Sequence, residues 1–268
     1  MGSKMRLVHS ARCEDAWIVG ALDAADGDTG LLILSGGNEI AIGPQRAMAR
    51  LARSVAERGW PVVRFDRRGI GDSDGVNRGW RSSAPDIAAA MSLFNYAPVK
   101  RVVAFGNCDA ATALALHRLP IAARVLGNPW LDLAAADLPP PAAIRSHYRQ
   151  RLFDPALWRS LVSGRVDVAK AVRGLRAVLG GGAGPGALTV EFATLLRENP
   201  MPTRIVLSAR DATGIAFADA WRHPVFDDLR DAIPVDRIDT DSHGFTATAD
   251  LGALRNILLA VIEETSAA

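Results

Sequence analysis

Short apolar runs rich in Val, Ile and Leu alternate along this chain with longer, alanine-rich segments of helical periodicity. The short runs predict strands, because they are bounded by turn residues and contain β-branched side chains. We expect strands at residues 16–22, 30–35, 61–66, 100–105, 123–128, 203–208 and 234–239. The segments between them predict helices at residues 44–58, 84–94, 109–118, 215–222 and 250–264. This alternation is typical of an α/β fold, with a mostly parallel sheet flanked by helices.

The alternation stops between residues 130 and 200. That segment opens with the proline-rich LPPPAA, continues with helical periodicity, and holds the glycine-rich GGGAGPG at residues 180–186. Glycine-rich stretches of this kind behave as flexible loops. We therefore expect a core at residues 5–129 and 201–268 with an inserted helical cap at residues 130–200. Insertions of this kind often cover active sites.

Composition narrows the class of protein. The chain has 268 residues, 49% of them hydrophobic, and a formal net charge of +2, which supports one large core and does not indicate nucleic-acid binding. Cys13 and Cys108 are far apart and match neither a disulfide framework nor a zinc site, which favours a reducing, cytoplasmic setting. We expect no transmembrane segment and no signal peptide, because no apolar run is long enough. The first four residues, MGSK, read as a cloning remnant ahead of Met5.

The stretch FGNCDAATAL, residues 105–114, places Cys108 where a predicted strand gives way to a helix. This is the layout of a nucleophile elbow, a sharp turn that pushes its central residue outward and needs small residues two positions to either side. Gly106 and Ala110 meet that need. A helix N-terminus favours a thiolate, whereas the carboxylate of Asp109 disfavours one. Taken alone, the motif fits a nucleophile or a buried packing cysteine equally well.

Two further polar residues follow predicted strands. Asp211 lies in SARDATG after the strand at 203–208, and His243 lies in DTDSHGFT after the strand at 234–239. Singly, these residues would be read as a helix cap and a surface histidine. Nucleophile, acid and then histidine is, however, the chain order of the α/β-hydrolase triad. We therefore predict a catalytic triad of Cys108, Asp211 and His243, with Asp132 as the alternative acid.

An oxyanion hole is expected from the loop that follows the strand at 30–35, together with the amide after the nucleophile. The loop sequence LSGGNEIAIG contains two glycines that allow the backbone to come close, one of them Gly37. We predict the backbone amides of Asn38 and Asp109 as the donors. A plain glycine turn is the alternative interpretation of this loop.

The glycine-rich stretch RFDRRGIGDSDG, residues 64–75, raises the question of a dinucleotide cofactor. Its spacing is G-x-G-x-x-x-G, which departs from the dinucleotide-binding fingerprint. A structural turn that leads into a helix explains the stretch better. Acyl chemistry at a cysteine needs neither a metal nor an organic cofactor, so we expect none.

Several of these stretches resemble the exosortase A system-associated hydrolase 1 family. They are residues 35–75, FGNCDAATAL, GNPWLDL at 127–133, HYRQRLFDPALWRSLVSGR at 147–165 and SHGF at 242–245. The elbow of that family resembles G-x-C-D-G, so Cys108 and Asp109 match, whereas Ala110 departs from the pattern. The resemblance implies an α/β-hydrolase fold and a link to the exopolysaccharide and exosortase gene clusters of Gram-negative bacteria.

The function predicted from these residues is hydrolysis of an ester or thioester through an acyl-enzyme on Cys108. His243 would take the thiol proton, and Asp211 would orient the imidazole. Two alternatives stay open. One is an acyltransferase that uses the same triad, and the other is a non-catalytic binding protein that keeps the fold.

The expected cap is strongly basic between Arg145 and Arg176. It holds eight basic side chains against two acidic ones, and the basic residues are Arg145, Arg149, Arg151, Arg159, Arg165, Lys170, Arg173 and Arg176. This excess is either a solvated helix face or a surface that attracts an anionic carrier or head group. Apolar residues recur at helical spacing in the same segment. We expect Phe153 and Trp158 of this segment, with Trp130, to contact the substrate.

Overall fold

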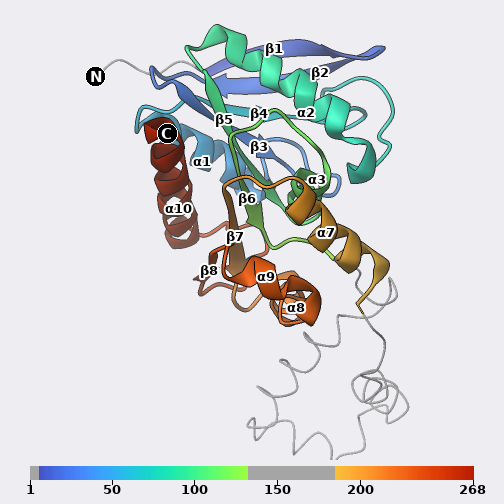
Figure 1. Ribbon diagram of the computed structural model, residues 1–268. Coiled ribbons are helices and arrows are strands. Elements are labelled where there is room, and N and C mark those ends of the chain that lie inside the picture. Colours follow the sequence, from blue (N-terminus) through green and yellow to red (C-terminus); the bar gives the residue numbers. More distant parts are fainter. Residues whose placement is uncertain (1–5, 132–184) are drawn as a thin grey trace, which may run out of the picture.

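The computed structural model describes residues 6–131 and 185–268, which form a central sheet with helices on both faces (Figure 1). Eight strands are present in these ranges, in the order β1-β2-β4-β3-β5-β6-β7-β8. They are β1 (Arg6–Cys13), β2 (Ala16–Asp23), β3 (Thr29–Leu34), β4 (Val62–Phe65), β5 (Arg101–Asn107), β6 (Ala123–Gly127), β7 (Thr203–Ser208) and β8 (Val235–Ile238). Strand β2 pairs antiparallel with β1 and β4, and all other pairs are parallel. The predicted mostly parallel sheet is confirmed.

Helices cover the two faces of the sheet. One face carries α1 (Ala47–Ala56) and α10 (Thr248–Ala267), and the other carries α2 (Ala84–Met91), α3 (Asp109–Leu116) and α7 (Ala187–Glu198), as Figure 1 shows. Two further helices, α8 (Ala212–Ala220) and α9 (Asp227–Arg230), follow β7. None of the helices in the described ranges is both long and apolar enough to cross a membrane.

Each face of the sheet has its own apolar core. Along β3, Leu31 and Ile33 pack under α1 and α10, whereas Leu32 and Leu34 pack on the opposite side. Successive residues alternate between the two cores because side chains of a strand point to opposite faces. All of β3 is therefore buried, which explains why it reads in the sequence as one continuous apolar run.

Strand β1 and the start of helix α1 are among the elements that differ from the prediction. Residues 6–13 form β1, which pairs with β2 along its whole length but was not predicted from the sequence. As an edge strand, β1 buries only part of its side chains, so it has no continuous apolar run. Helix α1 begins at Ala47 rather than residue 44, because Gln45 and Arg46 have φ angles of 49° and 61° in a short 3-10 turn.

Helix α7 belongs to the segment in which we expected a cap. It packs against α3, and Phe192 of α7 is fully buried, with its ring 6.0 Å from that of Phe217 and 6.4 Å from that of Phe226. Residues 132–184, which make up most of the expected cap, lie outside the described residues. The cap therefore stays a prediction.

Candidate active site

Cys108 lies at the turn between β5 and α3, with a φ of 61° and a ψ of −127°. A non-glycine residue in such a backbone conformation costs about 1–3 kcal/mol, so its surroundings must hold it. Strand β5 and helix α3 come very close here. A Cβ added to Gly106 would lie 2.7 Å from backbone atoms of Ala110, so only glycine fits. The thiol is free and partly exposed. The turn therefore presents Cys108 to the outside at an energetic cost to the backbone.

His243, in the loop after β8, is held by Asp211, in the loop after β7. Its Nδ1 lies 2.9 Å from Oδ2 of Asp211. The same oxygen accepts hydrogen bonds from the amides of Thr213 and Gly214, at 3.0 and 3.1 Å. One carboxylate therefore caps α8 and also holds the imidazole.

These contacts change the protonation of the site. Hydrogen bonds with Asp211 and with Cys108 raise the pKa of His243 well above its ordinary 6.5, although partial burial opposes the change. Burial alone would raise the pKa of Asp211, but the contact with His243 and the two amides outweigh it and lower that pKa. The thiol of Cys108 is one of the groups that raise the pKa of His243, so it lies beside the imidazole. The arrangement favours a charged imidazolium.

Two asparagines hold the backbone of His243, and sequence analysis missed both. Nδ2 of Asn107 and Nδ2 of Asn128 donate to the carbonyl oxygen of His243, at 3.0 and 3.2 Å. Asn128 is fully buried, and its Oδ1 accepts the amide of Ser208 at 2.7 Å. Both asparagines stand at the carboxyl ends of neighbouring strands, where polar residues in a parallel sheet often serve a site. Their position at the ends of predicted strands was the one feature of the sequence that could have identified them.

The loop after β3 lies directly against the elbow. A Cβ on Gly36 would be 2.5 Å from the carbonyl oxygen of Asn107 and 3.2 Å from Cβ of Cys108, so only glycine fits. Gly37 has a φ of 56°, and its amide donates to Oδ1 of Asp109 at 2.7 Å. The predicted oxyanion loop is thus tied to the residue that follows Cys108.

The predicted donors lie at this junction. Asn38 follows Gly37 in the loop, and Asp109 is the first residue of α3, where amides have no partner within the helix. Oδ1 of Asn38 accepts a hydrogen bond from Nδ2 of Asn77, at 2.9 Å. The loop that follows β4 therefore also borders the site, which sequence analysis did not predict.

Of the expected substrate-binding residues, Trp130 lies next to the elbow. Its amide donates to the carbonyl oxygen of Cys108 at 3.3 Å, and its ring meets that of Trp80 edge to face at 6.2 Å. Trp80 belongs to the loop after β4 and had not been predicted. Phe153 and Trp158, together with the alternative acid Asp132, lie outside the described residues.

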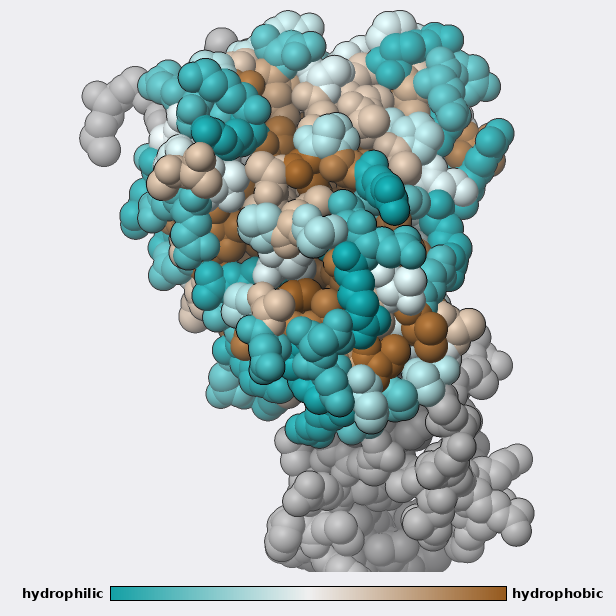
Figure 2. Space-filling view, in the orientation of Figure 1, coloured by the Kyte–Doolittle hydropathy of each residue, from teal (hydrophilic) through white to brown (hydrophobic). Residues whose placement is uncertain are grey.

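The loops at the site also expose apolar side chains. Ile40 is 47% exposed and Val76 is 68% exposed. In Figure 2, hydrophobic residues form separate brown patches between hydrophilic teal ones on the face that carries α7. The exposed Ile40 and Val76 make the loops beside the site partly apolar.

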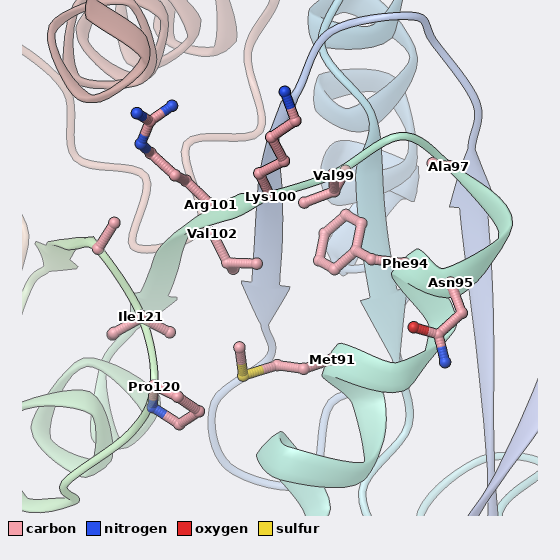
Figure 3. Close-up of a pocket in the computed structure, with 11 residues that line it drawn as sticks. Met91, Phe94, Asn95, Ala97, Val99, Lys100, Arg101, Val102, Pro120 and Ile121 are labelled. Atoms are coloured by element: carbon pink, nitrogen blue, oxygen red, sulfur yellow. The ribbon is translucent and has the colours of Figure 1, made fainter. Parts of the chain in front are cut away.

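An open pocket of about 600 Å³ lies at the opposite end of the sheet, at the start of β5 (Figure 3). Apolar Met91 and Ile121 line it together with Lys100 and Arg101. Both cations lie near Asp28, at 3.8 and 3.7 Å. The whole of β5 separates this pocket from Cys108, so it is not part of the site.

Within residues 6–131 and 185–268, no group of His, Cys, Asp and Glu side chains could hold a metal ion.

No protein-family model and no curated protein matches this chain in sequence. Solved structures do match. An α/β-hydrolase from Penicillium sp. sh18 is 17% identical, with a TM-score of 0.64 over 98% of this chain and 100% of its own. An esterase of Pyrococcus furiosus is 16% identical, with a TM-score of 0.63 over 97% of this chain and 91% of its own. The thioesterase domain from the curacin biosynthetic pathway is 15% identical, with a TM-score of 0.60 over 96% of this chain and 99% of its own.

Similarity at these identities establishes the fold and leaves the activity to be argued from the site. The resemblance to the exosortase-associated hydrolases stays a prediction. The sheet order, the helices on its two faces and the structural matches agree with one another, and the chain has the α/β-hydrolase fold.

Proposed function

We propose that this protein hydrolyses an ester or thioester through a covalent intermediate on Cys108. The observation that carries the proposal is the backbone of Cys108, held at a φ of 61° beside an imidazole that Asp211 orients. A cysteine that only packs against its neighbours needs no such conformation, and strain of this kind is typical of functional sites. The other cysteine, Cys13, is 2% exposed within β1.

The first half of the reaction forms the acyl-enzyme. His243 takes the proton of the Cys108 thiol, and the sulfur attacks the carbonyl carbon of the substrate. A C–S bond forms, the carbonyl oxygen becomes an oxyanion, and the amides of Asn38 and Asp109 donate to it. The tetrahedral intermediate then collapses, and the leaving alcohol or thiol takes its proton from His243.

The second half releases the product. His243 removes a proton from water, and the resulting hydroxide attacks the thioester carbon. Collapse of this second intermediate breaks the C–S bond, frees the carboxylic acid and returns the proton to Cys108. Asp211 keeps Nδ1 of His243 hydrogen-bonded throughout, so Nε2 faces the reacting atoms.

The acyl group that suits this site is uncharged. Carboxylates of Asp109 and Glu39 lie close to the elbow, and partial burial together with the charge of Asp109 raises the pKa of Glu39, although His243 opposes that change. A negative charge on the acyl group would be repelled there. The exposed apolar side chains of Ile40 and Val76 on the neighbouring loops suit a hydrocarbon better.

The acyl donor, the carrier and the acceptor are each inferred from a different observation. Likeness to a thioesterase domain and to an esterase supports both kinds of acyl donor. An anionic carrier at the basic segment 145–176 and a role in exopolysaccharide synthesis in the cytoplasm rest on the sequence alone. An acyltransferase is the second candidate, because a thioester on Cys108 remains a good acyl donor to an alcohol or amine.

Hydrolysis rates of esters of increasing acyl chain length test the proposal. p-Nitrophenyl and coenzyme A esters of increasing chain length are assayed with the wild type, Cys108→Ala and Cys108→Ser, with and without an added alcohol. We expect the alanine variant to lose activity by several orders of magnitude, because the members of a triad act as a unit. Substantial hydrolysis by Cys108→Ala would remove Cys108 as nucleophile. A new ester with the added alcohol would identify a transferase, and no turnover of any ester would favour a binding protein.

A further inference from the structure

Two side chains hold the backbone of Gly37 from opposite directions. Oδ1 of Asp109 accepts the Gly37 amide at 2.7 Å, and Nη2 of Arg67 donates to the Gly37 carbonyl oxygen. Both bonds involve a charged side chain, and such hydrogen bonds are about twice as strong as neutral ones. Neither side chain takes part in the proton transfers of the proposed reaction.

These two bonds determine which amide of the loop can meet the substrate. In a trans peptide, the carbonyl of one residue and the amide of the next point in opposite directions, and the described part of the chain has no cis peptide. By fixing the carbonyl of Gly37, Arg67 therefore also fixes the direction of the Asn38 amide. The amide of Gly37 is already bonded to Asp109. Of the amides of Gly37 and Asn38, that of Asn38 is thus the one that can meet an oxyanion.

Arg67 acts from a buried position just after β4. It is only 8% exposed. The same end of β4 holds the far end of the loop, where Oδ1 of Asp66 accepts the Ala41 amide at 2.5 Å and Nη1 of Arg64 donates to the Ala41 carbonyl at 3.0 Å. The loop is therefore held at both ends.

We propose that Arg67 and the side chain of Asp109 are positioning residues, which orient the Gly37–Asn38 peptide so that the Asn38 amide stabilises the oxyanion. This inference rests on the proposed function. It also gives the Asp109 side chain a role separate from that of its own amide. The carboxylate of Asp109, beside the nucleophile, holds the loop against the elbow.

The test compares two reactions of the same thiol. Acylation of Cys108 by p-nitrophenyl acetate creates an oxyanion, whereas alkylation by iodoacetamide displaces iodide at a saturated carbon and creates none. The ratio of the two rate constants therefore reports on the oxyanion hole apart from the reactivity of the thiol. The variants are Arg67→Met, Asp109→Ala and Asp109→Asn. The controls are Arg78→Gln and Asp241→Asn, both at exposed positions in loops that border the site.

We expect Arg67→Met and Asp109→Ala to lower the ratio of acylation to alkylation about a hundredfold, because loss of one oxyanion donor costs about 10²–10³ in rate. Asp109→Asn should lose less than Asp109→Ala, because its amide oxygen still accepts the Gly37 hydrogen bond. The two controls should keep the wild-type ratio.

An unchanged ratio in Arg67→Met and Asp109→Ala would overturn the inference, whether both rate constants stay the same or both fall equally. If Arg67→Met does not fold, the two Asp109 variants decide, since that side chain is partly exposed. A wild-type protein that is alkylated but never acylated would instead refute the proposed function, and this inference with it.

Discussion

Replacing Gly36 with alanine should disable the site without removing any group that reacts. The added Cβ would lie 2.5 Å from the carbonyl oxygen of Asn107, 2.9 Å from Oδ1 of Asp109 and 3.2 Å from Cβ of Cys108. Non-bonded heavy atoms ordinarily stay about 3.5–4 Å apart, so the loop must move about 1 Å away from the elbow. The Asn107 oxygen belongs to the backbone of β5 and cannot turn aside.

That displacement carries the Asn38 amide away from the oxyanion. The loss of one oxyanion donor lowers kcat by about 10²–10³, and overpacking costs about 1–3 kcal/mol of stability. Gly37→Ala is a matched control, because nothing lies within 4 Å of its added Cβ. Its φ of 56° makes alanine cost about 1–2 kcal/mol. The two variants should therefore lose similar stability, but Gly36→Ala should lose much more activity.

The assay measures kcat with a p-nitrophenyl ester and the free energy of unfolding in urea for both variants. A folded Gly36→Ala with wild-type kcat would refute the assignment of the loop to the oxyanion hole. An equal loss of kcat in Gly37→Ala would show that backbone strain, rather than the contact with the elbow, controls activity.

Three other predictions follow from the site. Asp211→Asn should lower kcat by about ten-thousand-fold, as the same exchange does in the serine triad, whereas a loss below tenfold in an ester assay would place the acid elsewhere. Iodoacetamide should modify Cys108 much faster than Cys13, because Cys13 is 2% exposed and burial raises the pKa of its thiol; equal rates in peptide mapping would make Cys108 a packing residue. The folded pKa of His243 lies above its ordinary 6.5 and that of Asp211 lies below its ordinary 3.8. The stability that this pair contributes should therefore be complete between those pH values, fall as pH rises above 6.5, and fall as pH drops below 3.8. Urea unfolding of the wild type and His243→Ala should differ most near pH 5, and a difference that grows toward pH 9 would contradict this.

The inner parallel strands could be predicted because burial on both faces leaves a continuous apolar run, as in β3. Strand β1 could not, because an edge strand with partly exposed side chains has no such run. Helix α7 looked like part of an insertion because glycines and prolines precede it. It packs against α3, and its Phe192 also meets Phe217 and Phe226, and all these contacts join residues that are distant in sequence.

The candidate triad could be proposed from the sequence because Cys108, Asp211 and His243 each follow a recognisable strand. The residues that support them could not. Asn128 serves His243 because the loops after β6 and β8 approach each other in space, and Arg67 serves Gly37 because β4 lies beside β3. Such roles depend on which strands are neighbours in the sheet, and the pattern of apolar residues does not predict the order of the strands.

The mass of the protein during turnover shows directly whether Cys108 carries the acyl group. The enzyme is mixed with a p-nitrophenyl ester, quenched in acid within one turnover, and digested for peptide mapping by mass spectrometry. We expect one acyl group on the peptide that contains Cys108, removable by hydroxylamine as a thioester is, and absent from Cys108→Ala. An acyl group on another residue, or turnover by the wild type with no adduct and equal turnover by Cys108→Ala, would contradict it.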